Sequence, residues 1–302
     1  MRLGARARIA IVGAGALAVA MAAGGVLAAA ECYRASTALL VPRILHGPGD
    51  GLDPESAAGL PFRTVDVPEP LGPAPAWLVP GAPSRWAIVV HGMGAPRAEG
   101  LPLLPALHDA GLTALIISYR NDPGAPGSPD GLSHLGADEW RDLDAAARFA
   151  VNHGARHLTL AGYSMGGAMV CDFLRRSPRA RLVTNVVLDA PVLEWRRPLA
   201  MAAARAGVPQ VLVAPTEAMV DWRTGIDLSE EDQLGQTDAF GARMLVLHGT
   251  ADSIVPIADS RALARAIPGR VRLVEFAGAG HAASWQSDPG RYDAALAAFL
   301  GR

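Results

Sequence analysis

The chain has 302 residues, a formal net charge of -2 at pH 7 and only two cysteines. This length suits one α/β domain with an N-terminal extension. The near-neutral charge, without a block of basic residues, argues against nucleic acid as a partner. Cys32 and Cys171 make neither a disulfide framework nor a zinc motif, so no metal is expected.

The N-terminal thirty residues differ in composition from the rest of the chain. Three arginines within residues 1–8 precede residues 9–30, which carry no charge. As a helix, this run is long enough to cross a hydrocarbon core of about 30 Å, and the arginines favour a cytoplasmic start. The three alanines before Glu31 also resemble a cleavage site. Residues 1–31 are therefore predicted to be a membrane anchor that contacts the membrane through residues 9–30, or a signal peptide. Either role places the remaining domain outside the cytoplasm, at the cell membrane or secreted.

Residues 42–302 are predicted to form the catalytic domain. Proline-interrupted segments at 62–67 and 74–80 are typical of short antiparallel edge strands. Six apolar runs then alternate with helical patterns, and their β-branched residues favour parallel strands buried on both faces. The runs span residues 86–94, 112–120, 157–164, 181–191, 242–252 and 271–281. We expect an α/β fold with a mostly parallel, doubly wound sheet of about eight strands and helices on both faces.

One segment interrupts this alternation. Residues 192–240 lie between the sixth and seventh predicted strands and contain helical pieces and an acidic stretch. Ligands of such sheets bind beyond the carboxyl ends of the strands, so an insertion there forms a lid or cap over the site.

The third parallel run ends in Gly162, Ser164 and Gly166, which fill the pattern G-x-S-x-G. A serine raised on a sharp turn between a strand and a helix needs neighbours without a side chain, whereas a serine in a core does not. The pattern therefore indicates a nucleophile.

Four loops at the carboxyl ends of strands carry polar motifs: HGMG, GYSMGG, HGTADSIVP and GAGH. With these motifs in this order, the chain from about residue 62 to 300 resembles the α/β-hydrolase superfamily, close to its bacterial esterase-like members. The resemblance implies Ser164 as nucleophile, Asp252 as acid and His281 as base. Asp189, which ends the sixth strand, is the alternative acid.

The resemblance also implies an oxyanion hole made of backbone N–H groups. One comes from Met165, directly after the nucleophile, and the other from Met93, with Gly94 as the alternative. His91 is expected to order the HGMG loop rather than to act chemically. His134, Glu139 and Trp140 lie in a loop that either caps a helix or lines the mouth of the site.

These observations predict a serine hydrolase that cleaves carboxylic esters through an acyl-enzyme, with small-molecule or lipid esters as candidate substrates and no cofactor. The alternatives are a peptidase or aminopeptidase of the same fold, or a binding relative without catalysis. A haloalkane dehalogenase is disfavoured, because its nucleophile is an aspartate.

Overall fold

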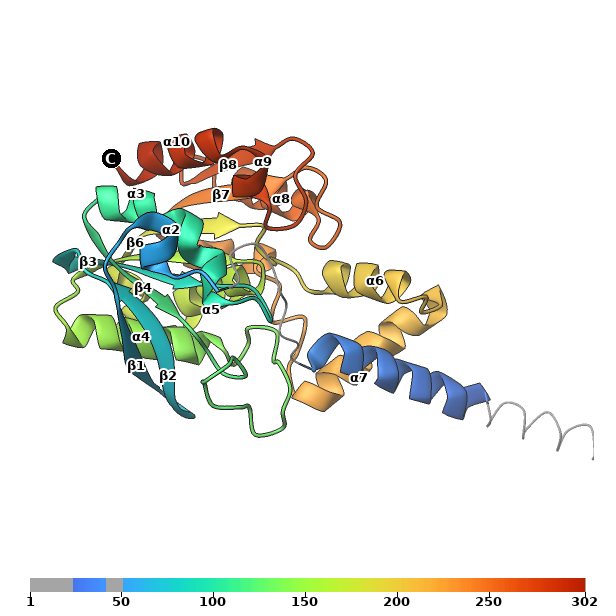
Figure 1. Cartoon of the computed structure of the whole chain (residues 1–302). Helices are drawn as coiled ribbons and strands as arrows, with labels where there is room; N and C mark the ends of the chain where they lie inside the picture. The colour runs from blue at the N-terminus through green and yellow to red at the C-terminus, as the bar shows by residue number, and fades with distance from the viewer. Residues whose placement is uncertain (1–23, 42–50, 302) are drawn as a thin grey trace, which may run out of the picture.

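The computed structural model describes residues 24–41 and 51–301. In these residues eight strands form one sheet in the order β1-β2-β4-β3-β5-β6-β7-β8, with helices on both faces (Figure 1). The strands are β1 (Arg63–Glu69), β2 (Gly72–Val79), β3 (Ala82–Val90), β4 (Leu112–Ile117), β5 (His157–Tyr163), β6 (Val183–Asp189), β7 (Arg243–Gly249) and β8 (Val271–Phe276). The predicted fold, an α/β-hydrolase sheet of about eight strands, is confirmed.

The six strands from β4 to β8 in this order are parallel, whereas β1 and β2 run antiparallel. Of these two strands, only β1 lies at an edge of the sheet; β2 lies one position inside, which differs from the expectation of two edge strands. The reason is the placement of the prolines. The pairing of β2 with β4 begins at Ala76, one residue after Pro75, so no proline has to donate to this ladder.

Two apolar cores flank the sheet. Side chains of β3 alternate between them: Ile88 and Val90 belong to one core, and Ala87 and Val89 to the other. The first core packs under α4 (Trp140–Asn152), α5 (Met165–Arg176) and α8 (Ile257–Ala266). The second packs under η1 (Arg97–Leu103), α3 (Leu104–Asp109) and α10 (Pro289–Leu300). Burial on both faces explains why the parallel strands are continuous apolar runs in the sequence.

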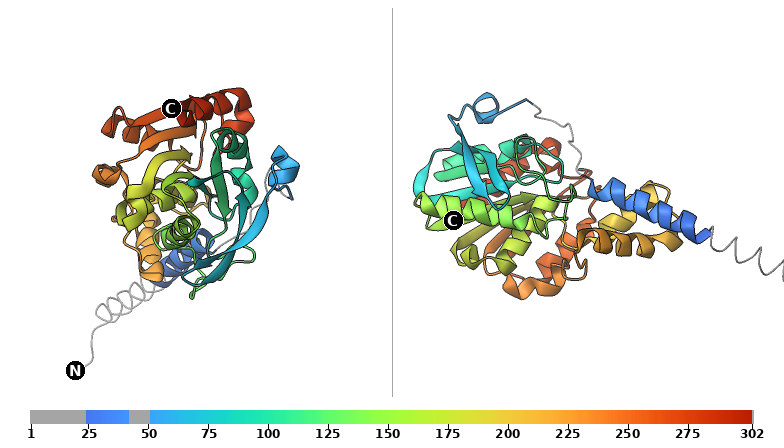
Figure 2. Two further views of the ribbon diagram at one scale, coloured as in Figure 1. Left: turned by 90° about the vertical axis from the view of Figure 1, so that its left-hand side faces the viewer. Right: turned by 90° about the horizontal axis from the view of Figure 1, so that it is seen from below.

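The insertion predicted at residues 192–240 is present between β6 and β7 and is called the lid below, while its position over the site stays a prediction. It contains α6 (Arg196–Arg205), η3 (Gln210–Leu212), α7 (Val213–Thr224) and η4 (Leu234–Ala239). The smaller remaining elements are α2 (Pro54–Ala58), η2 (Pro178–Leu182) and α9 (Ser284–Ser287). The lid helices α6 and α7 project from the sheet domain together with a helix at residues 24–40 (Figure 2).

The helix at residues 24–40 packs on the lid through several contacts. Arg223 of α7 donates hydrogen bonds to Ser36 Oγ (3.0 Å) and Thr37 Oγ1 (2.7 Å), and its guanidinium lies 4.4 Å from the Tyr33 ring centroid. Cys32 is buried and its Sγ lies 3.9 Å from the Leu212 carbonyl. The boundary predicted at residue 31 therefore falls inside a continuous helix.

Most of the predicted membrane segment, residues 9–23, lies outside the described residues. Among residues 24–41 and 51–301, no helix is both long and apolar enough to cross a membrane. Val26 and Leu27, at the start of the described helix, are exposed.

The turn between β5 and α5 is tightly packed against its neighbours. A Cβ on Gly162 would lie 2.4 Å from the Gly166 carbonyl oxygen, and a Cβ on Gly166 would lie 2.4 Å from the Val90 carbonyl oxygen. Three backbone segments thus approach one another at positions where only glycine fits.

This packing predicts that Gly162→Ala destabilises the fold by about 1–3 kcal/mol or more, because the new methyl group overlaps backbone atoms that belong to α5. Denaturant midpoints of the purified variant and the wild type measure the change. Gly241→Ala is the matched control, since its Cβ would meet no atom within 4 Å, and it should change stability by less than about 0.5 kcal/mol. Equal midpoints for the two variants would contradict this account of the turn.

Candidate active site

Ser164 lies between β5 and α5 in a strained backbone conformation, with φ 49° and ψ -116°. Such values cost a residue with a side chain about 1–3 kcal/mol and persist only where the surroundings enforce them. Here the Ser164 N–H donates to the Asp189 carbonyl (3.0 Å), and the Ser164 carbonyl accepts from Gly167 (2.9 Å) and Val192 (3.1 Å). The turn fixes the hydroxyl at the carboxyl edge of the sheet.

The structure brings all three predicted triad residues together. His281 Nε2 lies 2.9 Å from Ser164 Oγ, and His281 Nδ1 lies 2.8 Å from Asp252 Oδ2. Asp252 follows β7 and His281 follows β8, so the two loops meet Ser164 from neighbouring strands. Because Asp252 accepts, Nδ1 carries the proton of a neutral imidazole and Nε2 is left to accept from the serine hydroxyl.

Asp252 is held by more donors than His281 alone. Its Oδ1 accepts from the N–H groups of Ile254 (2.8 Å) and Val255 (2.9 Å), and the Nε2 atom of His248 lies 3.2 Å from Oδ2. Burial alone would raise the pKa of Asp252, but the interactions with His248, His281 and the Val255 N–H hold it well below its usual range. The carboxylate therefore stays ionised when His281 takes up a proton.

The sequence motifs did not identify His248 as a site residue. It lies at the end of β7, is fully buried, and its Nδ1 lies 2.8 Å from Ser260 Oγ. Its Nε2 faces two acceptors, the Asp252 carboxylate and the Val255 carbonyl (3.2 Å), so Nε2 carries the proton and Ser260 donates to Nδ1. The signal in the sequence was the four-residue spacing between His248 and Asp252 in HGTAD.

Asp189, the alternative acid, is directed elsewhere. Its Oδ1 accepts from Ser284 Oγ at 2.8 Å, and its Oδ2 is buried with no hydrogen-bond partner among the described residues. Burial raises the pKa of Asp189 to about 8. The side chain with these contacts does not orient His281, but its backbone carbonyl supports the nucleophile turn.

The loop after β3 presents the peptide group between Gly92 and Met93 in a fixed orientation. The Gly92 carbonyl accepts from His91 Nδ1 (2.8 Å) and the Tyr119 hydroxyl (3.0 Å), while the Gly92 N–H donates to Glu99 Oε2 (2.6 Å). In a trans peptide the next N–H points opposite to this carbonyl. His91 and Tyr119 thereby set the direction of the Met93 N–H, while Glu99 fixes the preceding peptide through the Gly92 N–H.

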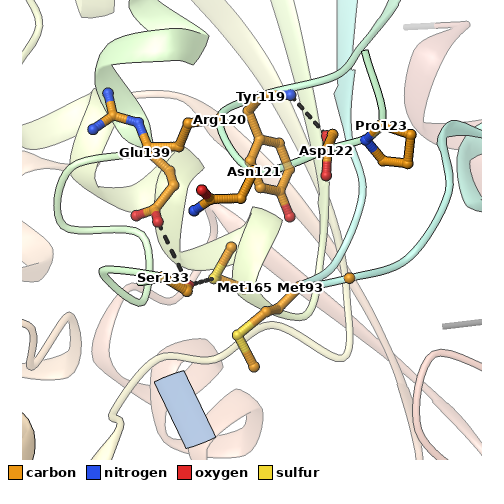
Figure 3. Close-up of a pocket in the computed structure, with 10 residues that line it drawn as sticks. Met93, Tyr119, Arg120, Asn121, Asp122, Pro123, Ser133, Glu139 and Met165 are labelled. Atoms are coloured by element: carbon orange, nitrogen blue, oxygen red, sulfur yellow. Dashed lines mark hydrogen bonds between the residues drawn. The ribbon is translucent and has the colours of Figure 1, made fainter. Parts of the chain in front are cut away.

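The two N–H groups assigned to the oxyanion hole are both available. Within residues 24–41 and 51–301, neither the Met93 N–H nor the Met165 N–H donates to a protein acceptor. Met165 is the first residue of α5, where backbone donors have no partner inside the helix. The Met93 and Met165 side chains line one small cavity of about 40 Å³, which Gly94 also lines (Figure 3).

His91 is fully enclosed behind this loop. Its Nδ1 faces the Gly92 carbonyl and its Nε2 lies 2.8 Å from Asp122 Oδ2, so both ring nitrogens face acceptors. Burial alone would lower the pKa of His91, but Asp122 and the Gly92 carbonyl raise it above the usual value. The ring also stacks on Tyr119 at 4.5 Å. These contacts agree with the expectation that His91 orders the loop.

The loop that contains His134 and Glu139 packs against the other side of this cavity. Glu139 is buried and accepts from the N–H groups of His134 (2.8 Å) and Gly136 (2.9 Å). Ser133 lies between Glu139 and Met165, with dashed contacts to both (Figure 3). Contacts with Asp138 and Asp130 raise the pKa of His134 to about 9. Glu139 lines the cavity, whereas Trp140 starts α4 outside it.

A larger pocket of about 800 Å³ opens beside His281. Its wall is mostly apolar and comes from α2, η1, α9 and the loops next to them. The polar groups in it include Glu99 and His281. In the described part of the chain, no group of three or more His, Cys, Asp or Glu side chains is arranged to hold a metal ion.

Fold and comparisons together define a serine hydrolase of the α/β-hydrolase fold. A model of the prolyl oligopeptidase family (Peptidase_S9) matches residues 107–302, and the chain belongs to this family. An uncharacterized protein of Mycobacterium tuberculosis is 27% identical over 255 residues, which cover 79% of each chain.

Three solved structures are similar in fold. An esterase from Pyrococcus furiosus has a TM-score of 0.66 at 17% identity, covering 86% of this chain and 98% of its own. An esterase from Thermogutta terrifontis has a TM-score of 0.58 at 19% identity, covering 79% and 98%. A bacterial membrane phospholipase A has a TM-score of 0.58 at 18% identity, covering 97% and 98%.

The contacts of the two aspartates predict different losses. Asp252→Asn should lower kcat by about 10⁴-fold, because an amide in place of the carboxylate favours the wrong tautomer of His281. Asp189→Asn should lower kcat far less, since its carboxyl contacts Ser284 instead. Steady-state kinetics of both variants on one activated ester measure the ranking. A larger loss in Asp189→Asn would assign the acid to β6.

Proposed function

We propose that the protein hydrolyses carboxylic esters through an acyl-enzyme on Ser164, with His281 as base and Asp252 as acid. The observation that carries the proposal is the continuous hydrogen-bonded path from Ser164 Oγ through His281 to Asp252, with 2.9 Å and 2.8 Å between the atoms. The strained turn at Ser164 and the buried, ionised Asp252 support the same assignment.

The reaction begins when Ser164 Oγ attacks the ester carbonyl and its proton passes to His281 Nε2. His281 is then an imidazolium beside the Asp252 carboxylate, which stabilises it. The tetrahedral intermediate collapses as His281 returns the proton to the leaving alcohol. Water repeats the sequence on the acyl-enzyme and releases the acid, so no cofactor is needed for the bond changes.

The N–H groups of Met93 and Met165 stabilise the negative charge on the tetrahedral oxygen by donating hydrogen bonds to it. His91 and Tyr119 fix the peptide that carries the Met93 donor before substrate arrives, and Glu99 fixes the peptide before it. Pre-orientation matters because a donor that need not reorganise lowers the barrier more than a mobile one.

The substrate class follows from the pocket of about 800 Å³ beside His281. Its mostly apolar wall suits an acyl or alcohol group with a substantial hydrocarbon part. Two of the similar structures are esterases and a third is a membrane phospholipase A, which supports esters and, among them, acyl lipids.

A second function has one observation in its favour. The family to which the chain belongs is named for prolyl oligopeptidases, and the same serine mechanism cleaves amides. A peptidase would need the pocket beside His281 to accept a peptide side chain next to the scissile bond.

Both functions predict that Ser164→Ala lowers kcat by several orders of magnitude and abolishes labelling by a fluorophosphonate. Assays on p-nitrophenyl esters of increasing chain length, with a matched aminoacyl p-nitroanilide, separate ester from amide cleavage. We expect ester hydrolysis to rise with chain length until the pocket is filled. If the wild type hydrolyses none of the esters but cleaves the anilide, it is a peptidase. If the fluorophosphonate does not label it, it is a binding relative.

We also propose that residues 9–30 hold the protein at the cell membrane with the Ser164 domain outside. The apolar run in the sequence and the arginines before it support this orientation. If the segment is cleaved instead, the domain is secreted into the same compartment. The helix at residues 24–40 then loses its first turns but keeps Ser36 and Thr37 on Arg223.

For an anchor, carbonate-washed membranes should retain the full-length chain, and protease added outside intact cells should degrade the Ser164 domain. For a cleaved signal, the wash should release a chain that begins at Glu31. A full-length, active chain in the cytoplasmic fraction would refute both.

A further inference from the structure

A second pocket, of about 380 Å³, adjoins the one beside His281. Leu52, Ala95, Pro96 and Ala98 line both pockets, so the two cavities share one wall. The second pocket is also lined by Trp77 and by Arg97, the first residue of η1. The positive charge of Arg97 therefore lies in a pocket that is separated from the apolar pocket beside His281 only by these shared residues.

Arg97 lacks the partners that a half-buried arginine usually has. Within residues 24–41 and 51–301 it forms no ion pair, and its Nη1 is buried without a hydrogen-bond partner. Its guanidinium lies 4.7 Å from the centroid of the Trp77 ring, which packs edge to face on Phe62 at 5.9 Å. Burial lowers the pKa of Arg97, although the nearby Asp122 counters this effect in part. Leaving such donors unmatched is costly, so the site favours an external acceptor.

The other charged groups of this pocket are already committed. Asp122 Oδ2 accepts from His91 Nε2 and from the Tyr119 N–H (2.8 Å each). Asp53 caps α2 and accepts from the Ser56 N–H (2.8 Å) and hydroxyl (2.8 Å). Among the charged side chains that line this pocket, Arg97 is thus the one with an unmatched hydrogen-bond donor.

We propose that Arg97 forms an anion subsite that binds a carboxylate or phosphate group of the substrate while the apolar part of the same molecule fills the pocket beside His281. The inference rests on the proposed ester hydrolysis and narrows its substrate class to esters that carry a second, anionic group. The planar guanidinium, which lies over the Trp77 ring, can present its N–H groups as a fork to two oxygens.

The kinetic test compares two esters of equal length, mono-p-nitrophenyl suberate and p-nitrophenyl octanoate. Arg97→Gln should reduce the ratio of kcat/KM for the anionic ester to that for the neutral ester by about 10- to 100-fold, the range expected for hydrogen bonds to a charged group. Arg97→Lys should retain part of the preference. Arg272→Gln is the matched control, because Arg272 is exposed and lines neither of the two pockets. It should leave the ratio unchanged.

A binding test in the Ser164→Ala background does not depend on turnover. Suberate or inorganic phosphate should raise the unfolding temperature above that in chloride of equal ionic strength, and adding Arg97→Gln should remove the increase. An increase with phosphate alone assigns a phosphate-bearing substrate, and one with suberate alone assigns a carboxylate.

The two tests separate the failures. If the wild type hydrolyses neither ester but the Arg97-dependent stabilisation is present, ester hydrolysis fails and the anion subsite stands. The subsite is overturned if the ratio in Arg97→Gln is unchanged, whether or not both rates fall. It is also overturned if neither anion stabilises the protein.

Discussion

The contact between the turn at Ser164 and the end of β3 is the constraint on which the rest of the site depends. Gly166 lies against the Val90 carbonyl, and this approach places the first turn of α5 directly beside the loop that begins at His91. The relative positions of the nucleophile and of both candidate oxyanion donors therefore depend on this one backbone contact. A bulkier residue at Gly166 would separate the serine from Met93 before it changed any catalytic side chain.

Around this contact, the side chains with chemical roles are supported by a ring of buried polar residues. On one side His248 and Ser260 continue the path from Asp252 into the core. On the other, Glu99 accepts from the Gly92 N–H and Tyr119 donates to the Gly92 carbonyl, so the two peptides on either side of Gly92 are held. Fixed partners of this kind reduce the reorganisation needed when charge develops on His281 and on the oxyanion.

The sequence was sufficient for the strands and for the loops that carry Ser164, Asp252 and His281, because buried parallel strands are continuous apolar runs and their carboxyl ends meet at one edge. It was not sufficient for Glu99, which acts on Gly92 only because η1 folds back over β3. Arg97 was equally hidden, since its isolation depends on where carboxylates from distant segments point. The choice between Asp252 and Asp189 also needed the structure, because both follow strands of the same sheet and only their side-chain directions differ.

The helix at residues 24–40 packs on the lid, although the two segments lie far apart in the sequence. Arg223 ties its last turns to α7, while Arg176 binds Glu231 (2.7 Å) and ties the turn that follows α7 to α5. The lid is thereby clamped at one end to the N-terminal helix and at the other to the helix that begins beside the nucleophile. Two arginine side chains thus join the N-terminal helix, the lid and α5, so a displacement of the N-terminal helix acts on the lid and, through the lid, on the helix that begins beside the nucleophile.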